Sequence, residues 1–276
     1  MDFGVTIFPT DETATPARVA VLAEQRGFES LWLPEHTHIP TARETPYPDG
    51  GEMPAHYWRT LDPFVSLASA AAVTTRIRLG TGICLVTQRD PIVTAKQVAT
   101  LDVLCDGRFE FGVGAGWNRG EIENHGTDMK RRFAVMRDRV QAMQAIWTQD
   151  AASYHGRFVN FDSIASWPKP RQQPYPPVWV GGNGPTVFDR VFAYGNGWLP
   201  NDDPHLAKRV RELHQQAEAL GASPVPVTLF GAERDARAAT RLIEAGVGRI
   251  IFRLPQAKDH DVERSLDELA GIVTSL

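Results

Sequence analysis

Short runs of β-branched and aromatic residues alternate with longer amphipathic segments along the whole chain. The short runs predict buried strands and the longer segments predict helices, so the chain reads as repeated βα units around a parallel sheet. Eight strands are predicted, at residues 3–8, 30–34, 77–86, 109–114, 178–181, 197–200, 225–230 and 249–254. Helices are predicted near residues 16–27, 62–75, 91–105, 131–149, 184–195, 204–220, 233–245 and 260–274. This count of strands and helices is that of a (β/α)8 TIM barrel.

A doubly wound sheet also alternates strands and helices, but it seldom contains eight βα units. The 276 residues could hold two domains, yet no linker-like shift in composition divides them. We therefore expect a single-domain α/β barrel over residues 1–276.

Two predicted connections are much longer than the roughly 2–6 residues usual between strands and helices. Residues 40–61 follow the second strand and so belong to the carboxyl face of the barrel, where barrel enzymes place their sites. Tyr57 and Trp58 lie in this segment, which we interpret as a lid over a substrate; an ordered surface loop is the alternative. Residues 151–177 precede the fifth strand, so we expect them mostly at the opposite face in a structural role.

Composition narrows the class of protein. Hydrophobic residues make up 42% and charged residues 22%, which is typical of a globular chain. The net charge of −4 gives no global attraction to nucleic acid or to an anionic membrane, and we expect neither partner. Cys84 and Cys105 lack metal or disulfide spacing, no run of 18 apolar residues occurs and no leader-like start is present, so we expect a cytoplasmic protein.

Glycines mark the ends of three predicted strands. The segment Gly181–Gly182–Asn183–Gly184 ends the fifth strand and leads into a helix expected to hold Pro185 in its first turn. Exposed amides at such a turn favour a phosphate, although a tight turn that binds nothing is the alternative.

Glycines two apart also occur in the third strand, at Gly80 and Gly82, and in the fourth, at Gly112, Gly114 and Gly116. They clear one wall at the mouth of the barrel, against which a flat ring could lie; relief of crowding inside the barrel is the alternative. The spacing is not a dinucleotide fingerprint, because helical periodicity is expected to resume only near residue 131.

His36 and His38 follow the second strand, where side chains reach the mouth of the barrel. A metal pair, a structural histidine and a proton-handling His36 are the possible interpretations, and we favour the last. Metal ligands are not expected, since the fifth strand ends in glycines and the last ends in Arg253, Leu254 and Pro255, none of which is a ligand. A basic cluster contains Lys130, Arg131, Arg132, Arg137 and Arg139. It is interpreted either as a solvated helix face or as a surface that attracts an anionic cofactor tail.

Several segments together resemble the luciferase-like monooxygenase superfamily of flavin- or F420-dependent barrel enzymes. They are LWLPEHTHIP from Leu31, LGTGICL from Leu79, GRFEFGVGAGWNRGEIENHG from Gly107, PKPRQQPYPPVWVGGNGPT from Pro168 and GNGWLP from Gly195. The chain is most similar to the subgroup that is associated with the deazaflavin F420. The resemblance implies an F420-dependent oxidoreductase that transfers a hydride between F420 and a small organic substrate.

The resemblance also implies roles for particular residues. His36 is implied as the catalytic group beside the reactive ring, and the peptide between Gly82 and Ile83 is implied to be cis. Tyr57, Trp58 and Trp117 are candidate substrate-binding residues. The candidate cofactor-binding residues are Gly82, Ile83, Gly114, Gly116, Gly181, Gly182, Asn183 and Gly184.

Two features depart from other members of this superfamily. Trp117 stands where some F420-dependent dehydrogenases have Glu, which argues against a sugar-phosphate dehydrogenase. The connection at 231–232 is too short for the mobile lid of the luciferases. Three alternatives to the F420-dependent oxidoreductase remain. They are an FMN-dependent monooxygenase that uses O2 and reduced flavin from a separate reductase, a non-catalytic flavin-binding protein and a barrel metallohydrolase. Many members form homodimers, and we expect one here.

Overall fold

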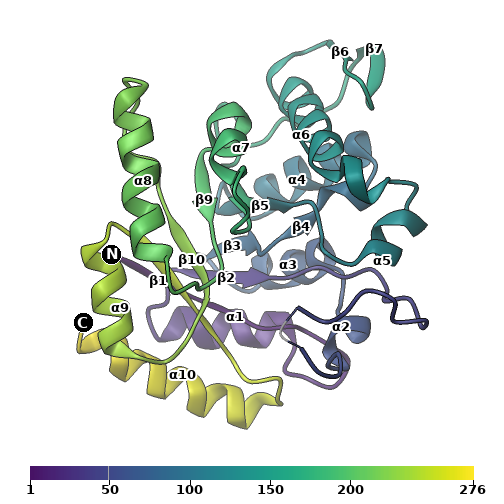
Figure 1. Ribbon diagram of the computed structural model, residues 1–276. Helices are drawn as coiled ribbons and strands as arrows, with labels where there is room; N and C mark the ends of the chain where they lie inside the picture. The colour runs from purple at the N-terminus through teal and green to yellow at the C-terminus, as the bar shows by residue number, and fades with distance from the viewer. Residues whose placement is uncertain (49) are drawn as a thin grey trace.

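The computed structural model describes residues 1–48 and 50–276 and shows a parallel β-barrel surrounded by helices (Figure 1). The sheet runs in the order β10-β11-β1-β2-β3-β5-β8-β9, with β4 also paired to β5. Isolated bridges from Trp198 to Val227 and from Asn201 to Phe230 bring β9 to β10 and nearly close the barrel. The barrel strands are β1 (Asp2–Thr6), β2 (Ser30–Leu33), β3 (Arg78–Thr81), β4 (Cys84–Leu85), β5 (Phe109–Gly114), β8 (Val178–Gly181), β9 (Gly197–Leu199), β10 (Thr228–Ala232) and β11 (Arg249–Arg253).

A helix follows each strand position of the barrel, which confirms the predicted fold class. These helices are α1 (Pro16–Gln25), α3 (Pro63–Ala71), α4 (Pro91–Leu104), α6 (Arg132–Thr148), α7 (Val187–Tyr194), α8 (Leu206–Ala219), α9 (Ala236–Glu244) and α10 (Asp259–Thr274). The first three begin with proline directly after a capping residue, Thr15, Asp62 or Asp90, whose side chain accepts a hydrogen bond from the first turn. Among the described residues, no helix is long and apolar enough to cross a membrane.

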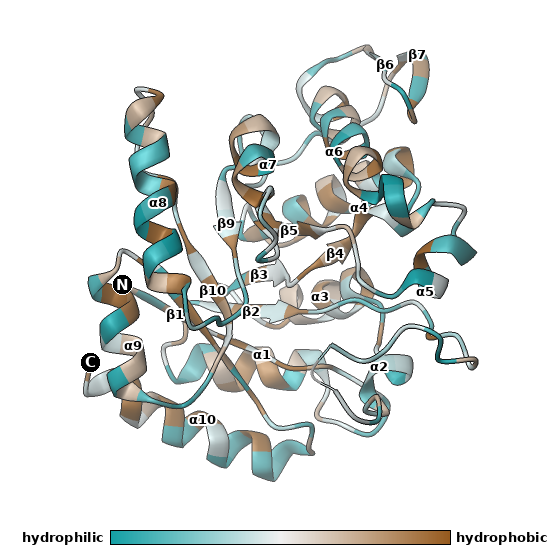
Figure 2. Cartoon of the chain, viewed as in Figure 1, coloured by the Kyte–Doolittle hydropathy of each residue, from teal (hydrophilic) through white to brown (hydrophobic). Residues whose placement is uncertain are grey.

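The core lies between the barrel and its ring of helices. Hydrophobic colour concentrates on the strands, whereas the outer helices mix hydrophobic and hydrophilic residues (Figure 2). Phe109, Phe111 and Val113 are fully buried on β5, and Leu31 and Leu33 are fully buried on β2. Strands buried on both faces explain why the predicted strands read as continuous apolar runs.

The third predicted strand is interrupted. β3 ends at Thr81 and β4 begins at Cys84, and the peptide between Gly82 and Ile83 is cis, as the resemblance implies. β3 pairs with both β2 and β5, whereas β4 pairs with β5 alone. The backbone therefore leaves its regular register at the carboxyl end of the barrel.

Three features of the connections differ from the predictions. Residues 151–177 contain a hairpin that was not predicted, β6 (Ala152–His155) and β7 (Asn160–Ile164), which packs against α6. Later in this segment, Gln172 donates to the Phe109 carbonyl at the start of β5, which is the opposite face, as predicted. Helical structure resumes before residue 131, in α5 (Arg119–Asn124) and a 3-10 turn (Met129–Arg131). α7 begins at Val187, so Pro185 precedes the helix. Residues 40–61 contain a short helix, α2 (His56–Arg59), and Asp49 lies outside the described residues.

Candidate active site

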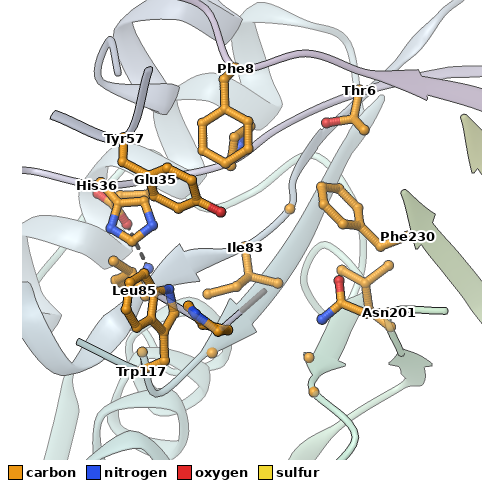
Figure 3. Close-up of a pocket in the computed structure, with 18 of the residues that line it drawn as sticks. Thr6, Phe8, Glu35, His36, Tyr57, Ile83, Leu85, Trp117, Asn201 and Phe230 are labelled. Atoms are coloured by element: carbon orange, nitrogen blue, oxygen red, sulfur yellow. Dashed lines mark hydrogen bonds between the residues drawn. The ribbon is translucent and has the colours of Figure 1, made fainter. Parts of the chain in front are cut away.

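A cavity of about 570 Å³ opens at the carboxyl ends of the strands. Figure 3 shows its two walls, with His36, Glu35, Tyr57 and Phe8 on one side and Thr6, Phe230 and Asn201 on the other. Ile83 lies between the walls, and Trp117 lies below His36 in this view. The position agrees with the face on which TIM barrels carry their active sites.

Most of the site residues predicted from sequence meet at this cavity. Those that line it are His36, Tyr57, Gly82, Ile83, Gly114, Gly116, Trp117, Gly181, Gly182 and Gly184. Trp58 does not line it; the residue is 42% exposed, and the Arg43 guanidinium lies 4.3 Å from the centroid of its ring. Asn183 does not line it either, because its side chain exchanges hydrogen bonds with the backbone of Asn201.

His36 is held by a carboxylate that the sequence analysis did not identify. Its Nδ1 lies 2.9 Å from Oε2 of Glu121, a residue only 1% exposed. A carboxylate only accepts, so the His36 Nδ1 carries the hydrogen and its Nε2 is left for the cavity. The other oxygen of Glu121 accepts from the Thr37 amide at 3.2 Å, which fixes the carboxylate as well. The pair can therefore present Nε2 in one orientation as a proton acceptor or donor.

Aromatic rings surround His36. Its ring centroid lies 5.0 Å from that of Tyr57 and 5.9 Å from that of Trp117, and Tyr57 lies 5.0 Å from Phe8. His56 belongs to the same wall but has no carboxylate partner among the described residues. Burial, together with the nearby His36, lowers the pKa of His56, so this second imidazole is neutral at pH 7. The two histidines of the wall are therefore chemically distinct.

The glycines at the mouth do not leave a bare wall. A Cβ on Gly114 would lie 2.4 Å from Cδ1 of Ile83, and one on Gly181 would lie 2.9 Å from Cγ2 of Ile83. Ile83 therefore occupies the space that these glycines leave and forms an apolar floor. Deeper in the barrel, a Cβ on Gly112 would lie 2.0 Å from the Thr81 carbonyl oxygen, which is the packing explanation of that glycine.

In the loop after β8, the carbonyls of Asn183 and Gly184 are hydrogen-bonded and their amides are not. Arg209 donates to the carbonyls of Asn183 and Gly184, with the second bond 3.1 Å long. Among the described residues, the amides of these two residues donate to nothing. The Gly182 amide, by contrast, donates to Leu199 at 3.3 Å, and the backbone φ of +102° at Gly182 turns the chain. A Cβ on Gly184 would meet open space, so the loop forms an open cradle of donors that fits a phosphate.

Arg190 adds a positive charge to this cradle. It lines the cavity from α7, is 6% exposed, and makes one hydrogen bond, from Nη1 to Thr186 Oγ1 at 2.8 Å. Its Nε is buried without a partner, and it forms no ion pair with any described residue. Burial lowers the pKa of Arg190, and the neighbouring Arg132 lowers it further. A buried guanidinium with an unused donor, lining the same cavity as Gly184, fits an anionic ligand group.

Glu35 and Arg89 support the floor of the site. Glu35 is 3% exposed; it accepts from the Leu85 amide and from Arg89 Nε, each at 2.6 Å. Arg89 also reaches Asp62 at 2.7 Å. Burial, followed by the negative charge of Glu35, raises the pKa of the Cys84 thiol well above its usual value, so this thiol is protonated and unsuited to act as a nucleophile.

Replacing Arg89 with methionine is expected to lower the free energy of unfolding by about 3–5 kcal/mol, because it leaves a buried carboxylate without its cation. Urea denaturation measures this change. The double variant Arg89→Met/Glu35→Gln should recover much of the loss, since the amide no longer carries a charge. Equal stability of Arg89→Met and the unmodified protein would contradict the structural role of the pair.

The segment 40–61 is fastened at both sides of the cavity mouth. Arg59 pairs with Asp11 at 2.5 Å and with Glu12 at 2.8 Å, and the Arg119 amide donates to Thr45 at 3.1 Å. Tyr47, Pro48, His56 and Tyr57 of this segment line the cavity. The segment thus contributes part of the wall that contains His36.

His36 and His38 do not form a metal pair. His36 binds Glu121, whereas the His38 ring lies beside Thr37, Asn124 and His125. Across residues 1–48 and 50–276, no three His, Cys, Asp or Glu side chains are grouped as a metal site requires.

The chain belongs to the luciferase-like monooxygenase family, whose family model matches residues 1–261. Uncharacterized protein Rv0953c of Mycobacterium tuberculosis is 39% identical over 287 residues, covering 98% of each chain. The F420-dependent tetrahydromethanopterin reductase of Methanopyrus kandleri superimposes with a TM-score of 0.77 at 18% identity, covering 99% and 98% of the two chains. The oxygenating constituent of 3,6-diketocamphane monooxygenase of Pseudomonas putida, in complex with FMN, gives a TM-score of 0.67 at 18% identity, covering 89% of this chain and 72% of that one. Family membership makes this protein an oxidoreductase of the luciferase-like type, and the two structural likenesses show the shared fold.

Proposed function

We propose that this protein is an F420-dependent oxidoreductase that moves a hydride between the deazaflavin and a small organic substrate. The observation that carries the proposal is the buried His36–Glu121 pair, with its Nε2 left for the cavity. Hydride transfer to or from a carbon that bears oxygen requires a matching proton on that oxygen. His36 stands where a substrate against the aromatic wall could exchange that proton.

The residues of the site fit the cofactor in two places. The cradle of Asn183 and Gly184 with Arg190 would hold a phosphate, and the apolar floor of Ile83 would support a planar ring. When bound, F420 supplies a carrier of two electrons as hydride.

The chain itself would perform the remaining tasks. His36 Nε2 accepts the proton of an alcohol as it is oxidised, or returns it to a carbonyl oxygen in the reverse direction. Glu121 keeps the hydrogen on Nδ1 and stabilises the imidazolium. Trp117 and Tyr57 exclude water from the reacting atoms, and segment 40–61 covers the substrate.

The test is an equilibrium titration of the purified protein with F420 and with FMN, followed by fluorescence. Preferential binding of F420, followed by substrate-dependent oxidation or reduction of it, supports the proposal. Binding of F420 without turnover on any alcohol or carbonyl compound would indicate a flavin-binding protein. Binding of neither cofactor would contradict the proposal.

An FMN-dependent monooxygenase is the second candidate, because the Pseudomonas putida structure carries this fold with FMN bound. It predicts preferential FMN binding and O2 consumption when a separate reductase supplies reduced flavin. The same titration, run with an oxygen electrode, separates it from the first candidate.

We also expect a homodimer that covers the outer face of α3 and α4. Neighbouring helices α3 and α4 expose Val65 at 73%, Val93 at 56% and Leu104 at 62%, an apolar surface typical of a protein interface. The double variant Val65→Glu/Val93→Glu should be monomeric in size-exclusion chromatography with light scattering. Leu220→Glu, an equally exposed apolar position on the far end of α8, is the control and should leave the mass unchanged. An unmodified protein that is already monomeric would contradict the expectation.

A further inference from the structure

A second cavity of about 350 Å³ adjoins the phosphate cradle on the outside of the barrel. Phe133 and Arg190 line both cavities, so they form the boundary between them. We call the outer one the arginine groove; it is lined by Phe133, Arg137, Arg157, Phe158, Thr186 and Arg190. A ligand group that leaves the cradle past Arg190 would enter this groove.

Three parts of the chain build the groove. Arg137 comes from α6, Arg190 from α7, and Arg157 from the turn of the β6–β7 hairpin, which stands beside α6 in Figure 1. The hairpin turn is held in place by Asp138, which accepts from the Val159 amide at 2.9 Å and from the Phe158 amide at 2.5 Å. The hairpin thus brings an arginine to the carboxyl side of the barrel, next to the cofactor site.

The groove carries an excess of unpaired positive charge. Arg137, Arg157 and Arg190 form no ion pair with any residue that the structure describes, and neither does the adjacent Arg132. The guanidinium groups of Arg132 and Arg190 lie 4.3 Å and 4.2 Å from the centroid of the Phe133 ring. These four positive charges lie around one groove, and those of Arg132 and Arg190 both lie against the Phe133 ring. They repel one another unless anions lie between them.

Two carboxylates also face the groove and do not cancel this charge. Asp138 is engaged by the two hairpin amides and by the Tyr154 hydroxyl, which donates to it at 2.8 Å. Burial, with this hydrogen bond, raises the pKa of Tyr154 to about 12, so the hydroxyl stays a donor. Asp189 is exposed in the first turn of α7 and is the remaining negative group. The four arginines outnumber these two.

We propose that the arginine groove binds the carboxylates of a cofactor tail that continues beyond the phosphate, which is the oligoglutamate chain of F420. This inference rests on the proposed function, because FMN ends at its phosphate and would leave the groove unused. The buried Arg190, with its unpartnered Nε, holds the phosphate at the boundary, and Arg137 and Arg157 meet the carboxylates outside.

The test compares F420 that carries its glutamates with F420 from which the glutamates have been removed. The unmodified protein should bind the intact cofactor about 5- to 10-fold more tightly at low salt, the range that two exposed charge pairs provide. The preference should shrink as ionic strength rises. In the variant Arg137→Ala/Arg157→Ala it should disappear, while affinity for the glutamate-free cofactor stays unchanged.

The matched control is Arg211→Ala/Arg237→Ala, which removes two exposed arginines from α8 and α9 and should keep the preference. Equal affinity of the unmodified protein for both forms of F420 would overturn the inference, as would a preference that survives in the groove variant. Either result leaves the proposed function standing, because glutamate-free F420 still binds. Failure of both forms to bind would overturn the proposed function together with the groove.

Discussion

Substituting His36 with alanine is expected to reduce turnover by about 10²–10⁴-fold, the usual contribution of a positioned general acid or base. The dissociation constant of the cofactor should change little, because the proposed phosphate cradle lies in the loop between β8 and α7, whereas His36 follows β2. The measurement is the single-turnover rate of the F420 absorbance change, with a substrate found by screening alcohols and carbonyl compounds. A fluorescence titration gives the affinity of the same variant.

Two further variants define the role of His36. Glu121→Gln keeps the shape of the partner but removes its charge, so it should lower turnover by less than His36→Ala does. His56→Ala removes the other imidazole of the same wall; burial and His36 lower the pKa of His56, and it has no carboxylate partner, so turnover should stay within a few-fold of the unmodified value. Unchanged turnover in His36→Ala, or an equal loss in His56→Ala, would contradict the assigned role.

The barrel could be predicted because each βα unit is encoded locally. A buried parallel strand needs a continuous apolar run, which is visible in the sequence. The start of a helix is visible too where a capping residue precedes a proline, as at Asp62–Pro63 and Asp90–Pro91. The hairpin β6–β7 was missed because it is largely exposed and lacks an apolar face. α5 was missed because its six residues are mostly polar and include a glycine, which gives too few positions for helical periodicity to show.

The parts of the site that are set by local sequence could be predicted. The contacts between residues far apart in the sequence could not. His36 and the glycine loop stand at strand ends, so their place at the mouth of the barrel could be predicted, whereas the role of His36 is implied by the resemblance. Glu121 lies 85 residues from His36, and its sequence context reads as a helix cap, since Asn118 accepts from the Glu121 amide. The Glu121 side chain takes no part in that cap, so nothing in the local sequence indicates that it binds His36. The packing of Ile83 against Gly114 and Gly181 could not be predicted either, because it depends on contacts between strands.

Trp58 illustrates a limit of the predicted lid. Aromatic residues in a long loop at the carboxyl face are reasonable substrate contacts, and Tyr57 does line the cavity. In the short helix α2, however, consecutive side chains point about 100° apart. His56 and Tyr57 face the cavity, which turns Trp58, the next residue, away from it. Trp58 packs instead under Arg43.

Arg190→Leu is expected to weaken binding of a phosphate-bearing cofactor by about 10- to 100-fold, because hydrogen bonds to charged groups are worth about 1.5–3 kcal/mol. The protein without ligand should lose little stability, or gain some. Arg190 is buried with Nε unpaired, and desolvation lowers its pKa, so its charge costs free energy until an anion arrives. Thermal melting of the ligand-free protein and fluorescence titration with FMN and F420 measure the two effects.

Riboflavin, which has the ring and ribityl chain of FMN but no phosphate, separates a ligand contact from a structural one. Affinity for riboflavin should be the same in Arg190→Leu and in the unmodified protein, while affinity for FMN falls. The reason is that Arg190 is bonded to Thr186, two residues after Gly184, whereas the Ile83 floor lies against Gly114 and Gly181. An equal loss for both flavins, with a lowered melting temperature, would mean that the guanidinium maintains the loop through its bond to Thr186 and does not meet the phosphate.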